Sequence, residues 1–94
     1  MTYRLLFKVE AKKEWDKLDA VIRKQFKKKL VQRLEHPRVE SARLSGMHDC
    51  YKIKLRSAGY RLVYQVRDAE VVVSVVAVGK RERNAVYKTA VKRI

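Results

Sequence analysis

The residues best suited to chemistry are cations that alternate with apolar side chains in the stretch 50–66, CYKIKLRSAGYRLVYQV. This alternation predicts an antiparallel hairpin whose turn includes Gly59. If Lys54 faces Arg61 across the hairpin, Lys52 lies two residues further along the same surface, because directly opposed residues point to one face. Like charges placed opposite each other destabilise a hairpin. A chain that keeps such a cluster favours an anionic ligand, for which RNA phosphate is the candidate.

A further group of cations follows the last predicted strand, in the segment GKRER. The short turn 67–70 requires this strand to return beside the hairpin, so that its end lies near the start of the second hairpin strand. This register brings Arg81 to the same rim of the sheet, with Lys80 and Arg83 beside it in the chain. Tyr87 follows within the next helix. The pattern predicts one electropositive pocket built from distant segments.

Such a pocket could serve RNA cleavage in three ways. It can hold the scissile phosphate, neutralise the charge of a pentavalent transition state, and supply a base if one lysine loses its proton. Neighbouring cations and partial burial both lower the pKa of a lysine, which makes proton transfer from a ribose 2′-hydroxyl reasonable. An exposed tyrosine such as Tyr87 could stack on a base. The alternative is a phosphate-binding patch without catalysis, and spacing alone favours that alternative.

Other chemistries have weaker support. The sequence has no Walker loop, dinucleotide glycine fingerprint, HExxH motif or metal-spaced Cys/His cluster, so we expect neither a cofactor nor a metal ion. His36 and His48 flank one loop and could run ribonuclease-type acid–base chemistry, but loop histidines without fixed geometry are more often bystanders. Cys50 has no activating group placed beside it by the sequence, so we expect a strand thiol and not a nucleophile.

Composition narrows the class of partner. The 94 residues are 47% hydrophobic, which indicates a single globular domain, 1–94, with a modest core. The 24 Lys and Arg against 10 Asp and Glu give a net charge of +14, which favours a polyanion, nucleic acid first. No apolar run could span a bilayer and the amphipathic helices have core spacing, so we expect no membrane partner. A single cysteine and no visible signal peptide indicate the cytoplasm.

The first half of the chain predicts a strand and a helical hairpin. The strand Thr2–Lys8 contains the run 5–7, LLF, which implies burial on both faces. After a first helix, Asp19 is expected to cap a second one that begins at Ala20 and ends before Pro37. Its predicted core face is Ile22, Phe26, Leu30, Val31 and Leu34, and its outer face is Arg23, Lys24, Lys27, Lys28, Lys29 and Arg33. A charged face is ordinarily just solvated, but six cations without an acid slightly favour a nucleic-acid contact.

The second half predicts the rest of a sheet. After the hairpin, the run 71–78, VVVSVVAV, is apolar at nearly every position and should be central or covered on both faces. Gly79 is expected to stop this strand, and Val86, Ala90 and Val91 mark a short closing helix. The order β-α-α-β-β-β-α predicts a two-layer α+β fold, with the N-terminal strand and helical hairpin packed on an antiparallel sheet of about four strands.

These segments resemble the RelE toxins of bacterial toxin–antitoxin systems, which are ribosome-dependent mRNA interferases within the RelE/ParE superfamily. The resemblance covers essentially the whole chain, through KEWDKL, KKKLVQRLEHPR, LSGMHDCYKIKLRSAGYRLVYQV, VVVSVVAVGKRER and VYKTAVKRI. The hairpin and GKRER segments are its specific part, because a basic helix alone is common. The resemblance implies a RelE-like fold.

The resemblance also implies a role for each site residue. Lys52 resembles the general base towards the ribose 2′-hydroxyl, and Lys54 and Arg61 resemble the clamp on the phosphate and transition state. Arg81 resembles the group that supports the leaving 5′ oxygen, and Tyr87 the residue that stacks on the mRNA. The implied reaction needs no metal ion and leaves a 2′,3′-cyclic phosphate and a 5′-hydroxyl within the A-site codon, which inhibits translation. The cations implied to contact substrate or ribosomal RNA are Lys80, Arg83, Arg23, Lys27 and Lys28.

The implied partners are mRNA, the 70S ribosome through its 30S A site, and a RelB-like antitoxin, with operator DNA bound only through the toxin–antitoxin complex. Two other functions stay open. A ParE-like gyrase poison would use the same scaffold to bind and not to cut RNA, and the full set of site cations with Tyr87 argues against it. A catalytically silent nucleic-acid-binding module would bind in a salt-dependent manner and create no new RNA ends.

Overall fold

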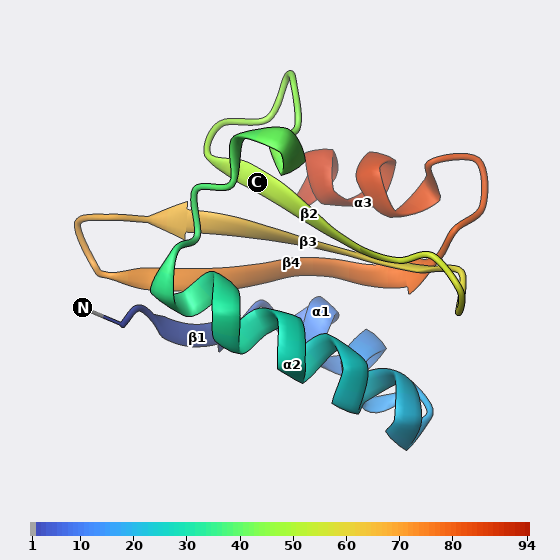
Figure 1. Cartoon of the computed structure of the whole chain (residues 1–94). Helices are drawn as coiled ribbons and strands as arrows, with labels where there is room; N and C mark the ends of the chain where they lie inside the picture. The colour runs from blue at the N-terminus through green and yellow to red at the C-terminus, as the bar shows by residue number, and fades with distance from the viewer. Residues whose placement is uncertain (1) are drawn as a thin grey trace.

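The computed structural model describes residues 2–94 and has the predicted order of elements (Figure 1). The elements are β1 (Arg4–Phe7), α1 (Val9–Asp16), α2 (Ala20–Glu35), a 3₁₀ turn (Glu40–Ala42), β2 (Cys50–Leu55), β3 (Tyr60–Arg67), β4 (Val72–Lys80) and α3 (Ala85–Arg93). The α+β class is thereby confirmed. None of the helices within residues 2–94 combines the length and apolar composition needed to cross a bilayer.

Within residues 2–94, four strands form one sheet in the order β1-β4-β3-β2. β2, β3 and β4 are antiparallel, as predicted, whereas β1 runs parallel to β4, so the sheet is mixed. Strand patterns specify which face is buried but not the direction of a neighbour. The expected burial of residues 5–7 on both faces is wrong, because Leu5 and Phe7 pack against the main core whereas Leu6, on the other face of the strand, is 48% exposed.

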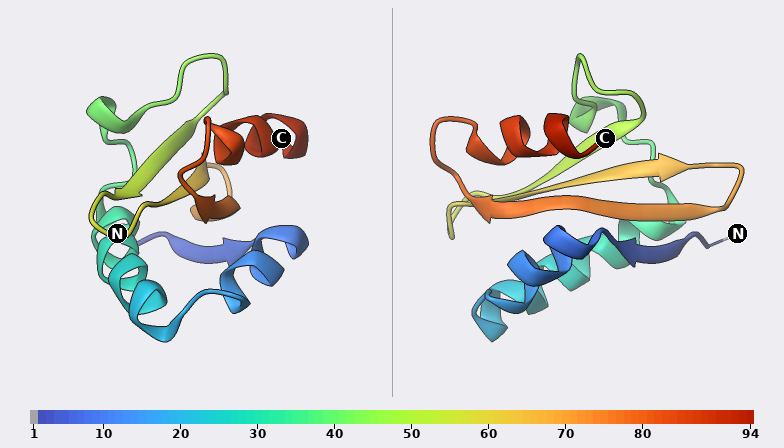
Figure 2. Two further views of the ribbon diagram at one scale, coloured as in Figure 1. Left: turned by 90° about the vertical axis from the view of Figure 1, so that its right-hand side faces the viewer. Right: turned by 180° about the vertical axis from the view of Figure 1, so that it is seen from behind.

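The helices cover both faces of the sheet. α1 and α2 pack against one face, and α3 lies on the opposite face (Figure 2). The structure therefore adds a layer to the two predicted layers, because the pattern of the closing helix does not indicate which face of the sheet it covers. Val86 and Ala90 of α3 are buried as expected, whereas Val91 is 52% exposed.

The helical hairpin agrees with its prediction in most details. Asp19 Oδ1 accepts a hydrogen bond from the Val21 N–H at 3.2 Å and caps α2. Phe26 and Leu30 are buried in the main core, but Val31 is 63% exposed, so its predicted core position is wrong. Successive helical residues are about 100° apart, and Val31 follows Leu30 directly and is turned away from the sheet.

The last strand departs from its prediction in a way that shapes the site. β4 does not stop at Gly79 but continues to Lys80, because Gly79 pairs with Arg61. The neighbours Val63 and Tyr64 pair with Ala77 and Val75, so Val76 is the extra residue of a β-bulge.

Candidate active site

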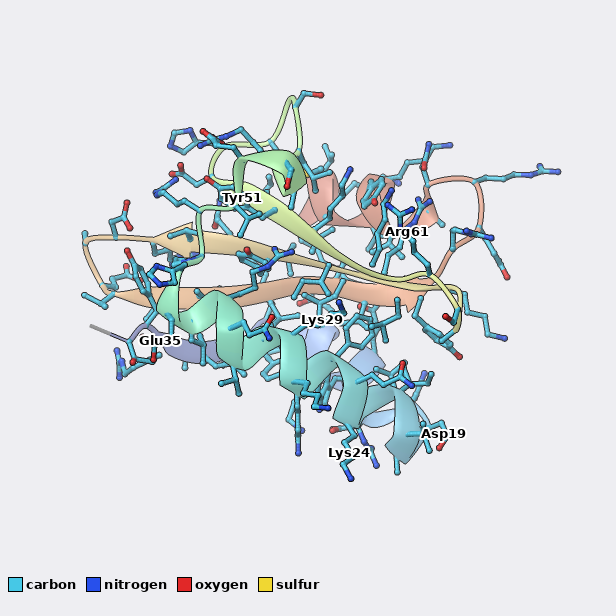
Figure 3. All side chains as sticks on the ribbon, viewed as in Figure 1. Asp19, Lys24, Lys29, Glu35, Tyr51 and Arg61 are labelled. Carbon is cyan, nitrogen blue, oxygen red and sulfur yellow. The ribbon has the colours of Figure 1, made fainter. Side chains whose placement is uncertain are left out.

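The hairpin has the register predicted from its alternation. Lys54 pairs with Arg61 and Lys52 pairs with Val63, so the three cations lie on one face of the sheet. Val63 belongs to the core cluster under α3, which places this face on the α3 side. Figure 3 shows Arg61 beside α3, while Lys24 and Lys29 lie on α2 across the sheet.

A hollow of about 140 Å³ lies at the end of the hairpin. Its lining is Lys54, Leu55, Arg56, Tyr60, Arg61 and Arg81, and within residues 2–94 no acidic side chain contributes to it. Arg81 is delivered by the end of β4, where its backbone N–H donates to the Gly59 carbonyl at 2.7 Å. The structure therefore brings Lys54, Arg61 and Arg81 together around one hollow, whereas the predicted site residues Lys52 and Tyr87 do not line it.

The Tyr87 ring packs against the Arg61 side chain. The Arg61 guanidinium carbon lies 5.0 Å from the centre of the Tyr87 ring, a cation–π contact. Burial raises the pKa of the Tyr87 hydroxyl, so it stays protonated. Among the described residues, neither Arg61 Nε nor the Tyr87 hydroxyl has a hydrogen-bond partner, although both are buried.

Asn84 is a site residue that the sequence analysis missed. Its side-chain oxygen accepts a hydrogen bond from Arg61 Nη1 at 3.0 Å. The residue has a φ of 62° and follows Arg83 with a φ of 46°, so two left-handed residues turn the chain from β4 into α3. Asn is the residue, after Gly, that tolerates this conformation best, and its place just before a helix was the available signal.

Crowding by cations lowers the pKa of Lys54. The largest cause is the charge of Lys52, followed by partial desolvation and by the charges of Arg61, Arg56 and Arg81. A lysine with a lowered pKa, which we expected from the composition of the pocket, is therefore present beside the hollow.

The backbone of β2 is fixed by α2. Arg33 Nη1 donates to the Lys52 carbonyl at 3.1 Å and to the Tyr64 hydroxyl at 2.8 Å. Arg33 therefore does not belong to the outer cationic face, where the sequence placed it, because its side chain reaches the edge strand. The contact orders the strand that carries Lys52 and Lys54.

The predicted RNA-contact residues lie outside the hollow. Lys80 lines a separate groove at the end of β4, and Arg83 lies in the turn between β4 and α3. Arg23 is half-buried on α2 and donates to the Asp16 carbonyl at 3.3 Å, while Lys27 and Lys28 are exposed. A second hollow, lined by Lys29, Lys54 and Arg56 among others, links the α2 lysines to the main one.

The alternative chemistries find little support in the geometry. His48 lies beside Asp49, with Nε2 and Oδ2 2.9 Å apart, before the first residue of β2 and at the strand end away from the hollow. Burial raises the pKa of the Cys50 thiol to about 11, which suits a strand thiol. Within residues 2–94, no group of three His, Cys, Asp or Glu side chains could hold a metal ion.

Comparison with known proteins places this chain in one class. Residues 5–85 match the family described as "ParE toxin of type II toxin-antitoxin system, parDE". The chain therefore belongs to this family of type II toxin–antitoxin toxins.

Within the family, the chain belongs with the RelE toxins. It is 64% identical over 94 residues to the "mRNA interferase toxin RelE" of Escherichia coli K12, covering 100% of this chain and 99% of the relative. It is 53% identical over 94 residues to a "Putative RelE-like toxin protein" of Escherichia coli, with the same coverage.

Solved structures agree with this grouping. A double Arg→Ala variant of E. coli RelE in the free state superposes with a TM-score of 0.92 at 62% identity, covering 100% of this chain and 99% of that chain. RelE in the intact E. coli RelBE toxin–antitoxin complex gives 0.83 at 63% identity, covering 86% of this chain and 99% of that chain. The predicted resemblance to RelE is confirmed.

Proposed function

We propose that this protein is the toxin of a type II toxin–antitoxin pair and an endoribonuclease that cuts mRNA in the ribosomal A site. The observation that carries the proposal is the gathering of Lys54, Arg61 and Arg81 around one hollow, with Tyr87 against Arg61. The names of the RelE relatives, which are mRNA interferases, support the same activity.

The proposed chemistry is an in-line transfer within the RNA strand. Lys52 takes the proton of the ribose 2′-hydroxyl, and the O2′ atom attacks the adjacent phosphorus. Lys54 and Arg61 hold the phosphate oxygens as the pentavalent transition state gains charge. The bond to the 5′ oxygen then breaks beside Arg81, and solvent supplies the proton for this leaving group. The products are a 2′,3′-cyclic phosphate and a 5′-hydroxyl.

The two lysines are given different roles. The charge of Lys52 lowers the pKa of Lys54, whereas the likeness to RelE points to Lys52 as the base. We assign the base to Lys52 and the phosphate contact to Lys54. Tyr87 is proposed to stack on a base of the mRNA after the Arg61 guanidinium turns towards the phosphate.

The proposed partners follow from the class. A RelB-like antitoxin neutralises the toxin, and operator DNA is bound only through that complex. The exposed cations Lys27 and Lys28, with Arg23, Lys80 and Arg83, contact ribosomal RNA or substrate. The protein acts in the cytoplasm, where translating ribosomes are found. The RelE–RelB complexes among the similar structures support the antitoxin assignment.

Primer extension on programmed ribosomes tests the proposal. The wild-type chain should produce new ends within the A-site codon. Lys52→Ala and Arg81→Ala should each lower the cleavage rate by about 100-fold or more, as expected for loss of a group that acts in the transition state. Lys13→Ala, which removes an exposed cation of α1, is the matched control. Full activity of both site variants would rule out this mechanism.

A gyrase poison is the second candidate, because the matched family is described by its ParE members. It predicts inhibition of gyrase supercoiling by the purified chain and no ribosome-dependent RNA ends. A supercoiling assay run beside the primer extension separates the two functions. RNA binding without new ends and without gyrase inhibition would instead favour the silent binding module.

A further inference from the structure

The helix that carries Tyr87 is tied to the sheet by a part-buried ion pair. Arg93, at the end of α3, donates from Nη1 to Glu14 Oε1 at 2.8 Å and from Nη2 to Oε2 at 3.1 Å. The side chains of Arg93 and Glu14 are 17% and 32% exposed. This bidentate, charge-assisted geometry is the strong form of an Arg–carboxylate contact.

The pair also completes the open edge of β4. The pairing of β4 with β1 ends where the Lys8 N–H, just after β1, donates to the Val75 carbonyl at 3.0 Å. Beyond that point the bulge at Val76 changes which backbone groups point outward. Arg93 Nη1 donates to the Val76 carbonyl at 2.9 Å, and Glu14 Oε1 accepts from the Val78 N–H at 3.1 Å. The ion pair therefore attaches α1 and α3 to β4 at one place.

The side chains that α3 buries completely are small. Its buried side chains are Val86 and Ala90, which are small and lie near the helix axis. α2, by contrast, inserts Phe26 and Leu30 into the main core. A helix held by small side chains can rock over the sheet unless its end is fixed. Arg93 lies six residues after Tyr87, about 9 Å along the helix at 1.5 Å per residue.

We propose that Glu14 and Arg93 are positioning residues, whose ion pair sets the angle of α3 and thereby holds the Tyr87 ring against Arg61. The expected effect on cleavage rate rests on the proposed function. The expected effect on the surroundings of Arg61 does not depend on that function. Neither residue touches the hollow, so they act only through the helix.

The kinetic test is a comparison of two backgrounds on programmed ribosomes. Arg93→Met and Glu14→Gln should each lower the saturating cleavage rate by about 10-fold, with little change in the half-saturating toxin concentration. When Tyr87 is already replaced by Ala, the same substitutions should have almost no further effect, because the ring they position is gone. Arg93→Lys keeps the positive charge but cannot form the bidentate contact, and should have a cleavage rate between those of the wild type and Arg93→Met.

The matched control is a surface ion pair of α1, the helix that carries Glu14. Lys12 and Asp16 are 2.6 Å apart, but their side chains are 54% and 56% exposed. Lys12→Met therefore removes a salt bridge from α1 without touching α3, and should leave the rate unchanged.

A second measurement does not depend on activity. Arg61 Nε is buried beside Tyr87, so its N–H signal in a ¹H–¹⁵N NMR spectrum should exchange slowly with water in the wild-type chain. Arg93→Met and Glu14→Gln should both speed this exchange about tenfold or more, and Lys12→Met should not. Unchanged exchange in folded Arg93→Met and Glu14→Gln proteins would overturn the inference. Equal rate losses with and without Tyr87 would do so too, even if the cleavage activity itself is as proposed.

Discussion

At the scale of single residues, the site depends on charges that repel one another. Lys52 and Lys54 project from the same face of β2, and Arg61 lies opposite Lys54. The ion pairs of residues 2–94 involve none of these three side chains. The resulting field lowers the pKa of Lys54 and leaves the hollow ready for an anion.

The first prediction concerns the source of that field. Lys52→Met should raise the pKa of Lys54, because removing the nearest positive charge favours the protonated amine. NMR titration of ¹³C-methylated lysines measures this pKa directly. Lys13→Met should leave it unaltered, since Lys13 is not among the causes of the shift. If the pKa of Lys54 is the same in the Lys52→Met protein, desolvation and the arginines account for the shift instead.

The second prediction separates two roles of Asn84. Asn84→Gly keeps the left-handed backbone but removes the acceptor of Arg61, so cleavage should fall several-fold with little change in stability. Asn84→Ala loses the acceptor as well and puts alanine, which tolerates the left-handed region less well than asparagine, at this position, at a cost of roughly 1 kcal/mol. Urea unfolding and single-turnover cleavage measure the two effects. Equal cleavage by wild type and Asn84→Gly would show that Arg61 needs no such partner.

At the scale of elements, the hairpin was predictable and the placement of α3 was not. Alternation in 50–66 permits one register that buries a single face, and that register gathers Lys54 with Arg61. The bulge at Val76 lies inside an apolar run, where no change of pattern marks it. The contact between Glu14 and Arg93 joins residues 79 positions apart, and only the packed structure brings them together.

The third prediction tests how closely α3 approaches the sheet. A Cβ added at Gly79 would lie 3.3 Å from Val86 Cγ2, tighter than an ordinary contact. Gly79→Ala should therefore displace the start of α3 slightly and lower stability by about 1 kcal/mol, the low end of overpacking costs. Val86→Ala should cost less in the Gly79→Ala protein than in the wild type, because the new methyl group fills the space. Strictly additive losses in urea unfolding would mean that the two positions do not press on each other.

At the scale of the whole molecule, positive charge is unevenly compensated. At the end of the sheet away from the hollow, Arg38 pairs with Asp49 at 2.9 Å and with Asp68 at 2.6 Å, and the Tyr3 hydroxyl donates to Asp68 at 2.6 Å. The hydrogen bonds from Tyr3 and Arg38 lower the pKa of Asp68. In the part of the chain that the structure describes, no acidic side chain lines either the main hollow or the second hollow beside Lys29. The chain therefore presents a strongly positive end to a polyanion.

The fourth prediction follows from this imbalance. With a net charge of +14, repulsion between surface cations opposes folding, and salt screens it over a Debye length of about 8–10 Å near physiological ionic strength. Raising NaCl from about 50 to 200 mM should therefore stabilise the free protein against urea while weakening its binding to a short single-stranded RNA. A chain that neutralises three or four phosphates should lose roughly 20- to 50-fold in affinity over this range, since the slope is about 0.7 per phosphate. Arg81→Ala should reduce the slope of log affinity against log salt by nearly the amount that one phosphate contributes, whereas Lys13→Ala should leave the slope unchanged. Loss of stability with added salt would mean that attraction within the exposed ion pairs outweighs the repulsion between surface cations. The excess positive charge would then not destabilise the folded state.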